Sequence, residues 1–333
     1  MTVSPAAALV WHRTGGSAGE PFLMPYTPAD DIRLRASVLA AMRMHGLRWS
    51  DRALWFLPPD THSRGGSRLF GRVRMIDSDA TTDDRLDALR SGAEPVLRGY
   101  PWPVWRAVVK ALRQGVPLPR RRLFVTGGEP LPRCVRRTLE RGLGARVVNR
   151  YSATDFGQIA VECVAGRLHV GAQSHVEILV GDAPADPGQE GEVVATNGFS
   201  RARPLIRVRS GDRATWSDKP CPCGSEVPSL ASVSGRVGDC IHTPRGSRVS
   251  SADIERALGE MNHGLLGFQF EQSGPVHVRA RLCLETPGVD AGETERVIKD
   301  LFQGMRVVVE YTDEILTELN GKTRVCRARG LPV

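Results

Sequence analysis

The sequence predicts an α/β fold: a large domain with mixed or parallel sheets and flanking helices, followed by a small mobile C-terminal α+β domain. Three observations support this prediction. The 333 residues suit one large domain and one small one. Residues 121–151 read as strand, turn, helix and strand, a βαβ unit that favours a parallel sheet. From about residue 240 shorter strands and helices alternate. We therefore expect domains over 1–238 and 239–333.

The N-terminal part predicts two strands and one helix. Residues 6–11 (AAALVW) indicate a short buried strand that runs into a glycine-rich loop. A helix is expected over 27–46, because the Thr-Pro pair that opens this segment is typical of an N-cap and a first helical turn. Residues 53–58 (ALWFLP) predict a buried strand, whereas the polar stretch 60–95 favours no particular element.

The βαβ unit is the clearest local pattern. A strand over 122–126 (RLFVT) leads through the turn 127–130 (GGEP) into a helix over 131–143, and a strand follows over 145–151 (ARVVNRY). Apolar residues recur every four positions of the helix, as one buried face requires: Leu131, Val135, Leu139 and Leu143.

Shorter elements follow in the rest of the chain. In the large domain we expect strands over 176–180, 191–196 and 205–210. In the small domain we expect helices over 251–259 and 291–303, and strands over 266–271, 276–284 and 305–311.

Composition excludes some functions and leaves others open. No apolar run reaches the roughly 18 residues of a transmembrane helix, and no secretory leader is evident, so we expect a cytoplasmic protein without membrane contact. Its seven cysteines are then thiols or metal ligands. The net charge of +8 comes from dispersed arginines. It suits a solvated surface or polyanionic substrates such as ATP, and no aromatic-interleaved basic stretch supports nucleic-acid binding.

Four loops carry groups suited to nucleotide chemistry, and each is weak alone. The glycine-rich loop 14–21 offers backbone N–H groups to phosphates, although such loops are usually turns. The turn 127–130 follows a strand at the sheet edge where nucleotides often bind. Residues 151–157 place a hydroxyl beside a carboxylate, as a metal–phosphate site needs. Asp212 could accept both ribose hydroxyls, with Arg236 adding a charge-assisted bond.

The order of these motifs resembles the phenylacetate–coenzyme A ligase family, from residue 14 to about 327. The loop 14–21 is similar to that family's Thr-Ser-Gly-Thr-Thr-Gly-Lys-Pro, and GGEP to its Gly-Ala-Glu-Pro. YSATDFG is similar to Tyr-Gly-x-Thr-Glu-x-Gly, and RVRSGD to Tyr-Arg-Thr-Gly-Asp. GRVGDCIHTPRGSRVSSADIE resembles the segment that leads into the C-terminal domain, and NGKTRV resembles its Gly-Lys element.

The resemblance implies a role for each matching residue. The β- and γ-phosphates of ATP would meet Thr14, Gly16, Ser17 and Gly19. The adenine would meet Gly128, Glu129 and Tyr151, and the ribose Asp212 and Arg236. Thr154 would contact the α-phosphate, Asp155 would hold Mg²⁺, Asp239 would be the hinge between domains, and Lys322 would reach the reacting groups from the small domain.

Three departures from the family pattern bear on function. Glu20 stands where the family loop has a lysine, and Asp155 stands where the family has glutamate. The family also carries a further region before the glycine loop that this chain almost lacks, which bears on the acyl pocket and on oligomer contacts. A homodimer is possible, and the sequence does not determine the oligomeric state.

A zinc site is expected from a second pattern. Cys221 and Cys223 form a C-x-C pair, and tetrahedral zinc needs two further ligands. Cys163 and His169 are the nearest other candidates, and the family resemblance implies a structural zinc on this set. Alternatively, the four residues are unconnected and Cys163 is a small buried hydrophobe.

The resemblance implies ATP-dependent activation of a small carboxylic acid, aryl or other, to its acyl-AMP with release of pyrophosphate. Acyl transfer to coenzyme A would follow. Two alternatives stay open: transfer of the acyl or AMP group to an amine, a hydroxyl or a carrier protein in biosynthesis, and a non-catalytic nucleotide-binding relic. The sequence does not identify the acid or the acceptor.

Overall fold

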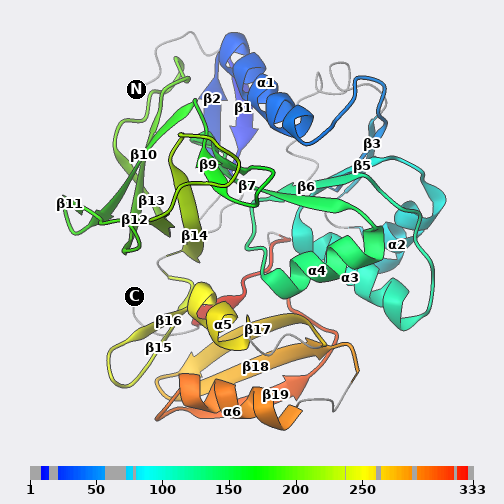
Figure 1. The fold of residues 1–333 in the computed structure, drawn as a ribbon, viewed down its shortest axis with the longest axis vertical. Coiled ribbons are helices and arrows are strands. Elements are labelled where there is room, and N and C mark those ends of the chain that lie inside the picture. The colour runs from blue at the N-terminus through cyan, green and yellow to red at the C-terminus, as the bar shows by residue number, and fades with distance from the viewer. Residues whose placement is uncertain are drawn as a thin grey trace.

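The computed structural model describes residues 9–14, 22–56, 73–77, 80–236, 238–259, 264–286, 291–318 and 321–328. It contains one 12-stranded mixed sheet flanked by helices, a separate N-terminal hairpin, and a two-stranded and a four-stranded sheet built from the residues after 240 (Figure 1). The predicted α/β class, with large mixed sheets and a smaller C-terminal α+β part, is confirmed. The mobility and the boundaries of the two parts stay predictions.

Five parallel strands form one half of the large sheet, in the order β4-β3-β5-β6-β7. Their bounds are β3 Ala53–Phe56, β4 Val73–Ile76, β5 Val96–Gly99, β6 Leu123–Gly127 and β7 Arg146–Ala153. Four helices accompany them: α1 Pro28–Met44, α2 Thr82–Ser91, α3 Pro101–Arg113 and α4 Arg133–Leu143. Apolar residues of α1 pack on one face of these strands, and those of α2, α3 and α4 pack on the other.

Antiparallel strands extend the sheet beyond β7 in the order β8-β9-β14-β13-β12-β10-β11. Their bounds are β8 Gly157–Glu162, β9 Leu168–Val170, β10 Ser174–Val180, β11 Ala183–Pro184, β12 Glu190–Asn197, β13 Val208–Trp216 and β14 Ser229–Arg236. The hairpin of β1 Val10–Arg13 and β2 Leu23–Tyr26 packs on this half through Tyr26 and Phe199, whose rings stack 5.9 Å apart.

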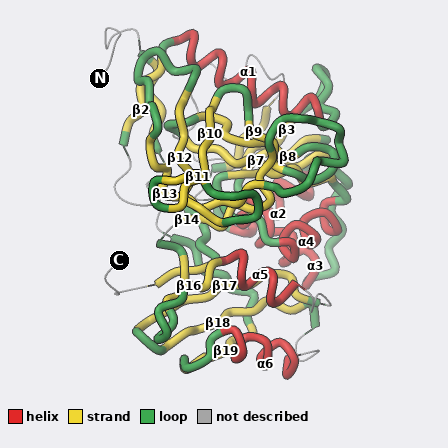
Figure 2. Tube along the Cα trace, turned by 60° about the vertical axis from the view of Figure 1, so that its left-hand side comes forward, coloured by secondary structure: helices red, strands yellow, loops and turns green. Residues whose placement is uncertain are grey.

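The C-terminal part lies below the large sheet in Figures 1 and 2 and has its own helices on its sheet. The four-stranded sheet has the order β19-β18-β17-β20. The elements are β15 Cys240–His242, β16 Arg248–Ser250, α5 Ser251–Gly259, β17 Leu265–Gly274, β18 His277–Leu284, α6 Ala291–Leu301, β19 Arg306–Tyr311 and β20 Cys326–Ala328.

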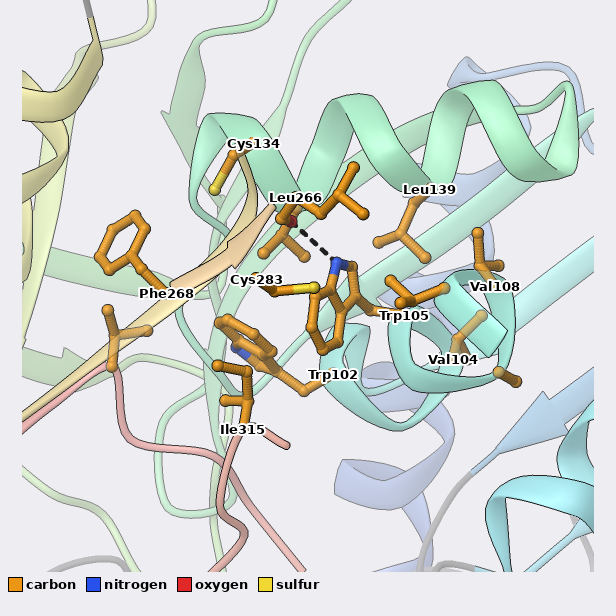
Figure 3. Packing of buried hydrophobic residues seen from close by; sticks show 14 of the residues in the cluster. Trp102, Val104, Trp105, Val108, Cys134, Leu139, Leu266, Phe268, Cys283 and Ile315 are labelled. Carbon is orange, nitrogen blue, oxygen red and sulfur yellow. Dashed lines mark hydrogen bonds between the residues drawn. The ribbon is translucent and has the colours of Figure 1, made fainter. Parts of the chain in front are cut away.

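Two tryptophans of α3 join the large sheet to the C-terminal part. Trp102 and Trp105 are fully buried, with their rings edge to face at 5.2 Å, and Figure 3 shows them among side chains of both parts. The indole N–H of Trp105 donates to the Leu266 carbonyl at 2.9 Å. A Cβ on Gly267 would lie 2.6 Å from the Trp105 ring, so glycine permits this close approach. The two parts therefore share one continuous apolar core.

Most predicted elements are confirmed, with small shifts at their ends. The helix expected over 27–46 is α1, which Thr27 caps by accepting the Asp30 N–H at 3.1 Å. The strand expected over 205–210 begins later, at Val208. That over 6–11 corresponds to β1, and residues 6–8 lie outside the described residues. Nothing in the sequence analysis assigned α3, whose two prolines stand within its first three residues.

None of the helices among the described residues combines the length and the apolar character needed to cross a lipid bilayer.

Candidate active site

The Gly-Gly turn after β6 packs against an aromatic ring that the sequence analysis did not single out. Gly128 has φ +80°, and a Cβ on it would lie 2.7 Å from Cε1 of Tyr100. The Nζ of Lys322 lies 5.4 Å from the centroid of the same ring. Lys322, from the C-terminal part, is thus brought to the carboxyl edge of the parallel strands, and burial lowers its pKa while Glu129 opposes that shift. The Gly-Tyr-Pro sequence at the start of α3 was the available signal for Tyr100.

Glu129 is a buried carboxylate that joins three segments of the chain. One oxygen accepts the Thr323 N–H at 2.5 Å, and the other accepts the Trp102 N–H, in the first turn of α3, at 3.3 Å. Burial raises its pKa to about 7, although these bonds and the charges of Arg106 and Lys322 oppose the shift. The side chain therefore holds the segment that carries Lys322 beside the Gly-Gly turn.

Asp212 and Arg236 lie opposite each other on β13 and β14. The Nε of Arg236 lies 3.1 Å from one carboxylate oxygen of Asp212, and the hydroxyl of Tyr151 donates to the other at 2.7 Å. Arg236 also donates to the Ser210 carbonyl at 3.1 Å. A carboxylate held from two sides in this way is oriented before any ligand binds.

The loop after β7 places Asp155 in the same electrostatic environment. Burial raises its pKa, the Arg236 charge lowers it, and the Asp212 carboxylate raises it further. The loop itself is held by main-chain contacts: the Tyr26 hydroxyl donates to the Thr154 carbonyl, and the Asn197 amide donates to the Asp155 carbonyl at 2.9 Å. Carboxylate oxygens are the donors that Mg²⁺ prefers, so the Asp155 side chain fits a ligand of this ion.

The glycine-rich loop is described only at its ends. Thr14 exchanges two hydrogen bonds with Phe22: its N–H donates to the Phe22 carbonyl, and its hydroxyl accepts the Phe22 N–H, both at 2.9 Å. Gly16, Ser17 and Gly19, expected at the phosphates, lie outside the described residues, as does Glu20.

Asp239 follows the last strand of the large sheet and is tied to the segment that carries Lys322. Its carboxylate forms an ion pair with Arg324 at 3.1 Å. Burial raises the pKa of Asp239 to about 6, although the charges of Arg324 and Arg236 lower it. The expected hinge residue is therefore part of a contact between two segments, not an isolated turn.

The four expected zinc ligands lie together, with all four ligand atoms within 4.8 Å of one another. Sγ of Cys163 lies 3.6 Å from Sγ of Cys221, and Sγ of Cys223 lies 3.5 Å from Nε2 of His169. The Nδ1 of His169 faces the Val227 carbonyl at 2.7 Å, an arrangement that leaves Nε2 as the ligand atom. The donor set and its spacing fit a closed tetrahedral zinc site.

Two curated relatives match this chain in sequence, both phenylacetate–coenzyme A ligases, whereas no family model matches it. The one from Thermus thermophilus is 23% identical over 261 residues, which cover 74% of this chain and 58% of the relative. The one from Pseudomonas putida is 24% identical over 328 residues, 91% of this chain and 73% of the relative. The chain thus spans 58% of the length of the first of these relatives.

The fold is similar to that of solved coenzyme A ligases. A 2-hydroxyisobutyryl-CoA ligase in its postadenylation state, in complex with R3-HIB-AMP, has a TM-score of 0.76 and 19% identity, covering 98% of this chain and 75% of that one. The same ligase in its thioesterification state has a TM-score of 0.59, so the present arrangement is closer to the former. The chain has the fold of the adenylate-forming coenzyme A ligases, and its sequence resembles the phenylacetate–coenzyme A ligases.

Proposed function

We propose that this protein activates a small carboxylic acid with ATP and passes the acyl group to coenzyme A. The observation that carries the proposal is the approach of Lys322 to the Tyr100 ring, beside the Gly128 turn and the buried Glu129. A cation from the C-terminal part thus lies beside the expected adenine turn, which supports the proposal. A lysine without a functional role is commonly solvated. Lys322 instead has its Nζ near the Tyr100 ring, and burial lowers its pKa.

The nucleotide would be held by residues of the large sheet. Asp212 would accept the ribose hydroxyls, with its orientation fixed by Tyr151 and Arg236. Gly128 and Glu129 would border the adenine, and Thr154 the α-phosphate. The phosphate contacts of Thr14, Gly16, Ser17 and Gly19 belong to the same proposal. Asp155 would be a ligand of Mg²⁺, which when bound neutralises phosphate charge.

The chemistry requires little covalent work from the chain. A carboxylate oxygen of the acid forms a bond to the α-phosphorus, the bond from that phosphorus to its bridging oxygen breaks, and pyrophosphate leaves with the electron pair. Lys322 offsets the negative charge that gathers as these groups approach, where little water screens it. In the second step the thiolate of coenzyme A attacks the acyl carbon, and AMP leaves. Asp239 is the proposed hinge between the domains 1–238 and 239–333.

A zinc ion on Cys163, His169, Cys221 and Cys223 belongs to the same proposal. Four protein ligands leave no position for substrate, so its role would be structural. It would tie the turn after β8 to the loop between β13 and β14, and so steady the strands that carry Asp212 and Arg236.

The test is acid-dependent release of pyrophosphate from ATP, over a panel of aryl, short-chain and amino acids. Formation of the thioester is followed in parallel by mass spectrometry with coenzyme A. We expect both products with at least one acid. Acyl-AMP without thioester would favour an amine, a hydroxyl or a carrier protein as the acceptor. Nucleotide binding without pyrophosphate release across the panel would favour a non-catalytic relic.

A further inference from the structure

Two arginines share one face of the parallel strands, close to their carboxyl ends. Arg98 on β5 is the register partner of Trp55 on β3 and of Val125 on β6. Val125 is in turn paired with Val148 on β7, two residues before Arg150. Paired residues and residues two apart lie on the same side of a sheet. The side chains of Arg98 and Arg150 therefore leave the sheet on the face that α1 covers.

Both guanidinium groups are held by neutral partners. The guanidinium of Arg98 lies over the Trp55 ring, 4.6 Å from its centroid. The Nε of Arg150 donates to the Gln158 side-chain oxygen at 3.1 Å, and the two residues are 8% and 6% exposed. Among the described residues, the arginines are thus held in place by an aromatic ring and an amide oxygen.

No ion pair or hydrogen bond to a carboxylate reaches either arginine within the part of the chain that the structure describes. Burial lowers the pKa of Arg98 to about 10 and that of Arg150 to about 9, and in each case a second arginine, Arg35 or Arg98, adds to the shift. Guanidinium groups nevertheless keep their proton in proteins. Buried charges are costly unless they are paired. Arg281, also buried, shows the usual arrangement, with Glu271 at 3.1 Å.

The position of the pair relates it to the proposed nucleotide site. Arg150 directly precedes Tyr151, whose hydroxyl reaches Asp212, and successive strand residues point to opposite faces of the sheet. Arg98 stands two residues before Tyr100, the ring beneath Lys322. Each arginine therefore stands within two residues of a ring at the expected site, Tyr100 or Tyr151, and Arg150 points to the opposite face of β7 from Tyr151.

We propose that Arg98 and Arg150 bind a second anionic group of the acid substrate, so that the preferred substrates are dicarboxylic acids. One carboxylate is activated and the other is held by the two arginines. This inference rests on the proposed function and names the substrate class of that site. Two fixed guanidinium groups would supply donors for a planar carboxylate and charge to neutralise it.

The test compares acids that differ only in the second carboxylate: succinate with butyrate, glutarate with valerate, and isophthalate with benzoate. Pyrophosphate release should give a kcat/KM at least tenfold higher for the diacid of the best pair. Arg98→Gln and Arg150→Gln should each lower that value about a hundredfold, mainly through KM. The monoacid should change by less than threefold. Arg90→Gln, on an exposed part of α2, is the matched control and should change neither.

Two measurements without turnover separate the alternatives. The melting temperature of Arg150→Gln without ligand should equal or exceed that of the wild type, because an uncompensated buried charge has been removed. Isothermal titration should show the diacid binding to the wild type and not to the variant, with ATP affinity unchanged. A variant that is destabilised and that loses activity equally with diacids and monoacids would show that the two arginines serve stability alone. A loss of ATP affinity would show instead that they bind phosphate.

The failures of the two proposals are distinguishable. If the wild type activates monoacids better than diacids, the dicarboxylate inference is wrong while the proposed function stands. If no acid releases pyrophosphate but the diacid still binds through Arg150, the proposed function is wrong and the anion site stands. Absence of both activation and diacid binding would overturn both.

Discussion

Glu129 accepts the backbone N–H of Thr323 at 2.5 Å, so a buried carboxylate of the large sheet holds the residue next to Lys322. The contact joins the turn after β6 to the segment before β20, 194 positions apart in sequence. Because this carboxylate is buried, its charge state affects stability as well as the position of Lys322. The protonation state of Glu129 and the position of Lys322 are therefore linked.

Glu129→Gln should reduce the pH dependence of stability. The pKa of Glu129 is raised from 4.5 to about 7 in the folded chain, so folding takes up a proton between these values. The contribution of this residue to the free energy of unfolding is fully present below pH 4.5 and is lost as pH rises through about 7, by an amount on the order of 3 kcal/mol. Urea unfolding at several pH values between 4.5 and 7.5 measures it. An identical pH profile in wild type and variant would contradict the shift.

Asp212→Ala should weaken ATP binding at least tenfold while the fold stays intact. Charge-assisted bonds of a carboxylate contribute about 1.5–3 kcal/mol each, and Tyr151 and Arg236 already orient this one. Isothermal titration with ATP measures the effect. Asp182→Ala, at a fully exposed carboxylate in the turn between β10 and β11, is the control. Equal affinities in both variants would remove Asp212 from the nucleotide site.

The protein purified without chelator should contain about one zinc per chain by elemental analysis. Cys221→Ser should lose the metal and lower the melting temperature, because three ligands cannot close a tetrahedral site. Cys240→Ser changes a buried thiol outside the four-residue cluster, with its Sγ 3.4 Å from Nε2 of His242, and should keep the zinc. Metal-free wild type with an unchanged melting temperature would rule the site out.

Lys322→Ala should slow acyl-AMP formation a hundredfold or more, since a positioned cation in a water-poor site stabilises the transition state by several kcal/mol. ATP affinity should barely change. Lys299→Ala, on the exposed side of α6, is the control. Single-turnover assays that start from ATP, and separately from synthetic acyl-AMP, resolve the two steps. If Lys322→Ala forms acyl-AMP at the wild-type rate, the proposed role of Lys322 is wrong.

Arg324→Gln should affect the second half-reaction more than the first. The substitution removes the ion pair of Asp239 and leaves that partly buried carboxylate without the guanidinium 3.1 Å away, which should favour departure of the C-terminal part from the present arrangement. The same two single-turnover assays report on it. A proline at Asp239 is a poorer probe of the hinge, because it also removes the N–H that donates to the Arg236 carbonyl at 2.9 Å. Equal effects on both steps would speak against a hinge there.

Local patterns predicted those parts of the fold that local interactions determine. The helix expected over 131–143 is α4, whose apolar face is buried and whose C-cap is Gly144 at φ 57°, and the strands on either side of it fall within two residues of their expected ends. The segment 60–95 remained unassigned although Thr81 and Asp84 form a capping box for α2, because its polar composition hid the short apolar stretch after them.

The sequence motifs named candidate residues for the site, but they did not predict which of these residues contact one another. Cys163 and Cys221 are 58 positions apart, and the antiparallel pairing of β9 with β14 brings their neighbourhoods together. Similarly, Glu129 was expected near adenine from its motif, whereas its bonds to the backbone of Trp102 and Thr323 depend on the packing of the C-terminal part. Arg98 and Arg150 look like surface arginines in sequence, and only the register of the sheet shows them on one covered face.

The two indoles of α3 give this protein a built-in optical reporter. Trp102 and Trp105 are both fully enclosed between the large sheet and the C-terminal part. Any departure of that part from α3 would hydrate them and break the bond from Trp105 to the Leu266 carbonyl. Their fluorescence would then shift to longer wavelength. Stopped-flow emission from the unlabelled protein would therefore test the proposed rearrangement in real time.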